Sequence, residues 1–211
     1  MKKIISLALA AVLALSLVAC GNKPVETTPV ETNPIETTTP VETTVPATEE
    51  NTAPAAGAVG VLENIWNLYG EDEKFAVIGG NMEAPVDGAP GNYDMAYAEN
   101  LSWNLLVPAE QLASIDEAAT MIHMMNANTF TSGVVHLTEG TDAAAFAQVM
   151  RDAIQSNRWM CGFPETLTVA IIGGEYVVIA FGVNDAMNPF MTHFAEAFPG
   201  ADILFNEAIE G

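Results

Sequence analysis

The sequence predicts an α+β domain in which two β-hairpins build one antiparallel sheet and helices cover one face of that sheet. Runs of β-branched and aromatic residues occur in pairs around turn residues, as in hairpins, and an amphipathic helical pattern follows each pair. The expected element order is therefore ββ-α-ββ-α, preceded by N-terminal helices. The folded domain is expected to span residues 58–211, an ordinary length for a single domain.

Two helices separated by a long loop are expected ahead of the hairpins. Apolar residues within 59–69 recur on one helical face, and Gly70 is a suitable residue to end that helix. Residues 71–92 are rich in glycine, proline and acidic residues, which is typical of a loop. A short helix is expected over 95–106, ending before Pro108 because proline disfavours helical backbone in the residue that precedes it.

The first hairpin is predicted from a turn between two apolar segments. Residues 118–125 fit a helix or a strand by pattern alone, whereas residues 131–137 have the composition of a strand. Asn126-Ala127-Asn128 between them offers turn chemistry, which favours a hairpin.

A helix and a second hairpin follow. Asp142 is expected to cap a helix whose apolar residues within 146–154 recur at i, i+3, i+4 and i+7. Strands are expected at 167–172 and 176–181, folded around Gly173-Gly174-Glu175, which is the clearest hairpin signal in the chain.

The C-terminal region is expected to add a final helix. This helix starts at either Asn184 or Asn188 and ends at Phe198, and Pro189 favours the later start because proline suits the first helical position. Residues 201–205 form either an edge strand or a tail.

Residues 1–19 have the features of an export signal. A positive start is followed by a short apolar stretch that ends in small residues, as in a secretory signal rather than a membrane span. Leu17-Val18-Ala19-Cys20-Gly21 resembles the lipobox of bacterial lipoproteins. This resemblance implies cleavage before Cys20 and a diacylglycerol on its thiol, which would anchor the exported protein in the lipid bilayer at the outer face of the bacterial cell membrane.

Residues 20–57 are expected to comprise the lipidated cysteine and a tether. A Pro-Val-Glu-Thr-Thr-like unit recurs every five or six residues, a period too short for a solenoid repeat. Proline blocks helices and sheet ladders, and the glutamates repel one another, so the tether is predicted to be disordered and partly polyproline. Fully extended, it would reach on the order of 115 Å. That reach favours a Gram-positive cell envelope.

The charge of the chain excludes several classes of partner. The sequence has 27 acidic residues against 6 basic ones, a formal charge of −21. Phosphate backbones and anionic membrane surfaces would be repelled. The folded domain keeps 21 acidic residues against Lys74, Arg151 and Arg158. The expected partners are therefore cationic or neutral proteins, peptides or envelope components, with no nucleic acid and no cofactor.

Three aromatic residues in or near predicted loops are the candidate binding residues: Trp103, Trp159 and Phe163. Aromatic side chains are frequent hot spots of protein interfaces, although a place in the core is the alternative for each of them. The sequence motifs of phosphate loops, zinc proteases and serine hydrolases are absent. A non-enzymatic binding or accessory function is therefore favoured.

Cys161 supports an alternative, a thiol-redox function. Residues 159–165 read Trp-Met-Cys-Gly-Phe-Pro-Glu and invite comparison with thioredoxins, whose motif places Trp before Cys-x-x-Cys. Here the second cysteine is absent, and the segment follows a helix instead of preceding one. The simpler interpretation is that Cys161 fills a small apolar space beside Trp159 and Phe163.

A metal site is the third possibility. On a strand, Met121, His123 and Met125 would share one face, and thioether and imidazole ligands suit Cu(I). Acidic residues in 71–73 and 87–94 could offer oxygen ligands to calcium, but the EF-hand spacing is absent. The simpler interpretation is that the methionines fill the core and the acids form a solvated surface.

Two segments carry a family resemblance. Residues 124–130 (Met-Met-Asn-Ala-Asn-Thr-Phe) and residues 159–165 resemble segments of Gram-positive lipoproteins, some of which are labelled bacteriocin transport accessory proteins. Residues 142–194 are also similar to a widespread lipoprotein domain of unknown function. The resemblance implies an accessory role outside the cytoplasm, and it implies no catalytic residue.

Overall fold

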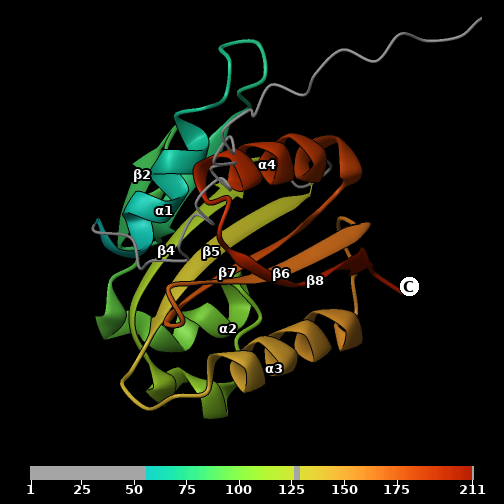
Figure 1. The fold of residues 1–211 in the computed structure, drawn as a ribbon. Helices are drawn as coiled ribbons and strands as arrows, with labels where there is room; N and C mark the ends of the chain where they lie inside the picture. Colours follow the sequence, from blue (N-terminus) through green and yellow to red (C-terminus); the bar gives the residue numbers. More distant parts are fainter. Residues whose placement is uncertain (1–55, 126–128, 211) are drawn as a thin grey trace, which may run out of the picture. The chain divides into compact units, whose positions relative to one another are not determined.

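The structure, a computed structural model, describes residues 56–125 and 129–210 (Figure 1). These residues belong to one compact unit. The predicted signal peptide, Cys20, the tether and the turn at residues 126–128 lie outside the described residues.

The described chain forms an α+β fold around one eight-stranded sheet, as expected for the class. Every strand pair is antiparallel. The strand order is β2-β1-β4-β5-β7-β6-β8, and β3 also pairs with β4. The strands are β1 (Val77–Asn81), β2 (Ala84–Asp87), β3 (Gly91–Asn92), β4 (Ile115–His123), β5 (Phe130–Leu137), β6 (Thr166–Ile172), β7 (Tyr176–Gly182) and β8 (Asp202–Ala208).

The helices divide between the two faces of the sheet. They are α1 (Gly57–Trp66), α2 (Leu101–Asn104), α3 (Ala143–Ser156) and α4 (Asn184–Ala197), with two 3₁₀ helices, η1 (Met95–Asn100) and η2 (Ala109–Ser114). One apolar core contains residues of α1 and α4, and the other contains residues of α2 and α3 (Figure 1). The expectation that helices cover one face is therefore wrong.

The two cores share the central strands because neighbouring residues of a strand point to opposite faces. On β5, Val134 belongs to the core under α1 and α4, and Val135 to the core under α2 and α3. On β7, Val178 and Val177 divide in the same way. All seven residues of β7 are buried, as expected of a strand that is covered on both faces.

The long loop expected over residues 71–92 is wrong, because this segment contains three short strands. Its glycines permit close backbone packing: a Cβ atom on Gly79 would overlap the backbone of Ala89 and Gly91. Gly80 has φ +75°, a left-handed conformation that favours glycine. The glycine content reflects this packing rather than a loop.

The ends of several helices refine the sequence prediction. The Asp142 side chain accepts hydrogen bonds from the backbone N–H groups of Ala144 and Ala145, so the predicted cap of α3 is confirmed. α4 begins at Asn184, which places Pro189 inside the helix and not at its first position. Residues 202–208 form the edge strand β8.

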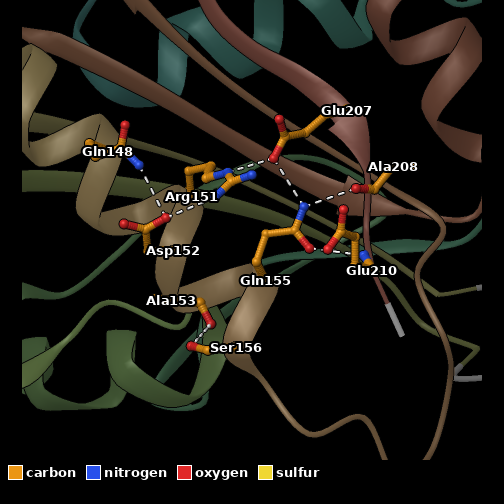
Figure 2. A network of polar contacts seen from close by, with 9 residues as sticks. All are labelled: Gln148, Arg151, Asp152, Ala153, Gln155, Ser156, Glu207, Ala208 and Glu210. Carbon is orange, nitrogen blue, oxygen red and sulfur yellow. Dashed lines mark hydrogen bonds and ion pairs between the residues drawn. The ribbon is translucent and has the colours of Figure 1, made fainter.

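Polar contacts from α3 fasten this edge strand (Figure 2). Arg151 Nε donates to Glu207 Oε1 at 2.5 Å, and Gln155 Nε2 donates to the same oxygen at 3.0 Å and to the Ala208 carbonyl at 2.9 Å. The backbone N–H of Glu210 donates to Gln155 Oε1 at 2.9 Å. The network holds β8 against the helix that packs beneath it.

Candidate functional site

Strand pairing gathers the loops of the sheet into two opposite ends. At one end, Phe130 of β5 and Thr166 of β6 both pair with Gly182 of β7, and Thr166 also pairs with Ala208 of β8. This end, called the apolar end, comprises residues 123–125, 157–166, 182–185 and 208–210, and in Figure 1 it is the end of β8 nearest the mark C. The other end, called the acidic end, comprises residues 115–117, 136–141 and 173–176.

The apolar end exposes large side chains that contribute nothing to either core. Met160 is 87% exposed and Phe163 is 67% exposed in the loop between α3 and β6, and Met124 and Met125 are 57% and 58% exposed after β4. These four residues are called the apolar surface. Scattered exposed apolar residues are common, but several at one end of a domain are typical of an interaction site.

The loop that carries Met160 and Phe163 is anchored by the residues between and beside them. The Trp159 ring lies 5.4 Å from the Phe181 ring, and Pro164 is buried. Gly162, in the bend between Trp159 and Pro164, has φ +78°, a left-handed conformation that favours glycine. Trp159 is therefore mainly a packing residue, whereas Phe163 is exposed to solvent, and its binding role stays a prediction.

The other sequence candidates have separate places. Trp103 is 83% exposed on α2, and no ring contact joins it to Trp159 or Phe163 among the described residues. Cys161 is an exposed free thiol, so the interpretation that it fills an apolar space is wrong. A thiol-redox function of Cys161 stays a prediction.

His123 lies at the apolar end in a largely apolar setting. Its ring stacks on Phe75 with centroids 4.8 Å apart, and its Nδ1 accepts the backbone N–H of Met125 at 2.9 Å. Burial lowers the pKa of His123, which favours the neutral imidazole. His123 and Phe75 line a hollow of about 230 Å³ with Val183, Asp185 and Ala186.

The residues predicted to hold a metal are not assembled into a site. Met121 is fully buried in the core, Met125 is exposed, and Nδ1 of His123 is occupied by a backbone N–H. Within residues 56–125 and 129–210, no group of three or more His, Cys, Asp or Glu side chains could hold a metal ion.

The acidic end is organised around His136, which the sequence analysis did not select. Nδ1 of His136 lies 2.5 Å from Asp116 Oδ1, and Nε2 lies 3.5 Å from Glu175 Oε2. His136, Asp116 and Glu175 line a hollow of about 400 Å³ with Glu139 and the glycine-containing turns 137–141 and 173–174. No lysine or arginine is among the residues that line it.

Opposing influences act on the proton of His136. Partial burial lowers its pKa, but the hydrogen bond to Asp116 and the charges of Asp116 and Glu175 raise the pKa by more, so the net shift is upward. The neighbouring Tyr176 has its pKa raised by burial and by the charges of Glu117, Glu175 and Asp116. The nearby carboxylates therefore act upward on the pKa of both groups, and for Tyr176 burial is the larger cause.

The signals that sequence reasoning missed are visible in retrospect. Met124 and Met125 directly follow β4, a position outside the strand that favours exposure over burial. His136 lies near the end of β5, and its two carboxylate partners come from 20 residues before it and 39 after it. Only the register of β4, β5 and β7 brings those groups together.

Comparison with known proteins finds no matching family model, no matching curated protein and no matching solved structure. In the described part of the chain, no helix is long and apolar enough to cross a membrane.

Proposed function

We propose that this protein is a lipid-anchored binding protein of the bacterial cell surface that holds a protein or peptide partner at its apolar end. The observation that carries the proposal is the apolar surface of Met124, Met125, Met160 and Phe163. Methionine is flexible and polarizable, so it adapts to partners of different shape, and an exposed aromatic ring adds a rigid anchor.

The sequence supports the remaining parts of this function. Cys20, in its lipobox-like setting, would carry the diacylglycerol, and the repeats after it would hold the domain away from the membrane. Replacement of Cys20 by serine is expected to release the protein from the membrane fraction into the medium. The acidic domain would then reach partners that are cationic or neutral, because anionic surfaces repel it.

The pairing of basic side chains with carboxylates supports the same preference for cationic or neutral partners. Lys74 pairs with Glu71 at 3.2 Å, and Arg151 pairs with Glu207 and with Asp152. Arg158 lies exposed beside the loop of the apolar end, where Glu165, Asp185 and Glu210 are also exposed. Acidic side chains therefore outnumber basic ones around the apolar surface, which suits a partner segment that combines apolar and basic residues.

The proposal is tested by selection of binding peptides from a random displayed library. The full-length protein is used as the target, and the selected peptides are expected to combine apolar and basic residues. Their affinity is expected to fall at least about tenfold on the double change Met160→Ser and Phe163→Ser, since hot-spot side chains each contribute more than about 1 kcal/mol. Met82 is the matched control, because it is 88% exposed but lies in the turn between β1 and β2.

Two results would contradict the proposed function. One is a set of selected peptides whose affinity is the same for the double variant and for the unchanged protein. The other is an equal loss of affinity on Met82→Ser, which would show that general surface apolarity and not the apolar end determines binding.

A further inference from the structure

His136 joins three segments of the chain that are distant in sequence. It lies on β5, its Nδ1 contacts Asp116 of β4 at 2.5 Å, and its Nε2 faces Glu175 of the β6–β7 turn at 3.5 Å. Asp116 occupies the point at which the register between β4 and β5 shifts, between Ile115 and Glu117. A single imidazole therefore connects an irregular strand with a turn.

The charged groups around His136 are all acidic. Asp116 and Glu117 come from β4, Glu175 from the β6–β7 turn and Glu139 from the segment after β5. Glu117 is engaged elsewhere, because its Oε1 accepts the backbone N–H of Ala58 at 2.9 Å.

One ring also packs against this imidazole. Tyr176 on β7 places its ring centroid 4.7 Å from that of His136. Its pKa is raised by burial and by the nearby carboxylates, so the phenol stays neutral over the range in which a histidine titrates. The charge of His136 therefore changes in that range, whereas the charge of the Tyr176 ring beside it does not.

The two protonation states of His136 make different contacts. An imidazolium has an N–H at both ring nitrogens, so it can donate to Asp116 and to Glu175 together. A neutral imidazole that keeps its proton on Nδ1 for Asp116 turns the lone pair of Nε2 toward the Glu175 carboxylate, and that contact becomes repulsive. The link to Glu175 therefore depends on one proton.

The backbone of the turn has its own support. The N–H of Leu137 donates to the Glu175 carbonyl at 2.9 Å, and the N–H of Glu175 lies 3.4 Å from the Ile172 carbonyl. Loss of the side-chain link would thus free the Glu175 carboxylate without separating the strands. Because Glu175, Gly173 and Gly174 line the 400 Å³ hollow, the shape and charge of the hollow would change.

We infer that His136 is a pH-operated latch on the β6–β7 turn, closed when the imidazole is protonated and open when it is neutral. The latch goes beyond the proposed partner binding, since it lies at the opposite end of the sheet from the apolar surface. Because the pKa of His136 is raised, the closed state persists to a higher pH than it would with an ordinary histidine. Opening removes the positive charge of the imidazolium and leaves the Glu175 carboxylate in the hollow without the charge that balanced it.

The latch is tested by NMR titration of the full-length protein. The imidazole Cε1–H signal of His136 is expected to titrate above the ordinary histidine value, and the amide signals of Gly173 and Gly174 are expected to shift with the same midpoint. Glu175→Gln is the diagnostic variant, because it removes the partner charge and retains the size of the side chain. In that variant the titration midpoint of His136 is expected to move to a lower pH. The amide signals of Gly173 and Gly174 are then expected not to shift with the titration of His136.

A second histidine provides the control. His123→Gln is expected to leave the titration of Gly173 and Gly174 unchanged, because His123 lies at the other end of β4. Glycine amides that do not follow the His136 midpoint, or that follow it equally in Glu175→Gln, would overturn the latch. A His136 midpoint at or below the ordinary value would overturn it as well. None of these results depends on binding at the apolar end.

Discussion

The two ends of the same sheet have opposite chemical characters, and the histidines on the neighbouring strands β4 and β5 show this most clearly. His123 stacks on Phe75 at the apolar end, and burial lowers its pKa. His136 lies between Asp116 and Glu175 at the acidic end, where its pKa is raised. The strands supply a rigid frame common to both, so the difference comes from the loops and strand ends.

The two ends have different tasks in the functions proposed above. The apolar end displays side chains that a partner can cover, whereas the acidic end contains a proton-dependent contact between its own segments. A binding surface and a latch can therefore be altered separately, which gives each a clean test.

The largest expected effect distinguishes buried from displayed aromatic residues at the apolar end. Phe130 is 1% exposed, and its ring lies 5.5 Å from Phe75 and 5.4 Å from Phe190. Phe130→Ala is expected to lower the free energy of unfolding by about 3–5 kcal/mol because it leaves a cavity. Phe163→Ala, at an exposed position, is expected to change it by less than about 0.5 kcal/mol.

Urea unfolding of both variants measures this difference. A similar loss of stability for Phe163→Ala would show that the Phe163 ring belongs to the core, and the division between the packed interior and the apolar surface would then be wrong.

The next largest effect is that the two histidines contribute to the free energy of unfolding with opposite dependences on pH. His136 holds its proton more tightly in the folded protein, so it contributes stability below its ordinary pKa of 6.5 that is lost as the pH rises through the raised value. His123 holds its proton less tightly when folded. The unfolded chain therefore takes up that proton first, and stability is lost as the pH falls through 6.5.

Unfolding free energies at about pH 6 and about pH 8 compare the two contributions. His136 raises the free energy of unfolding at the lower pH, and His136→Gln is expected to remove this gain. His123 lowers the free energy of unfolding at the lower pH, and His123→Gln is expected to remove this loss. Changes of the same sign in both variants would break the comparison between the ends.

The smallest effect concerns the edge strand that borders the apolar end. Arg151→Met removes the contacts with Glu207 and Asp152, which are accessible to water, so the change in global stability is expected to be small. Hydrogen exchange of the β8 amides is expected to accelerate because α3 then holds the strand less firmly. Lys74→Met, which removes the pair with Glu71 and the contact of the ammonium with the Trp66 ring and touches no residue of β8, serves as the control and is expected to leave β8 unchanged.

The sequence predicts the elements that local chemistry determines. Asp142 caps α3 through its own side chain, and the pair of strands around Gly173 and Gly174 needs only a turn. Coverage of both faces was misjudged, although the unbroken apolar run of β7 from Tyr176 to Gly182 indicates it. The strands within residues 71–92 were missed because their glycines look like loop residues until the neighbouring backbone is known.

The candidate sites, like the elements of the fold, are predictable from the sequence only where local chemistry determines them. Phe163 was selected because an aromatic residue in a loop is a local signal. The cluster of His136, Asp116 and Glu175 arises from the register of three strands, which no local pattern reveals. The metal hypothesis assumed one common environment for Met121 and Met125, whereas one is buried in the core and the other is exposed after the strand ends.

The most direct test of partner binding at the apolar end is site-specific photocrosslinking in the bacterium that makes the protein. A photoreactive phenylalanine analogue replaces Phe163 at the apolar end, Glu139 at the acidic end or the exposed Met82, one position at a time. The proposed function predicts a discrete crosslinked product from position 163 and none from positions 82 and 139. The same products from all three positions, or a product from position 139 alone, would contradict it.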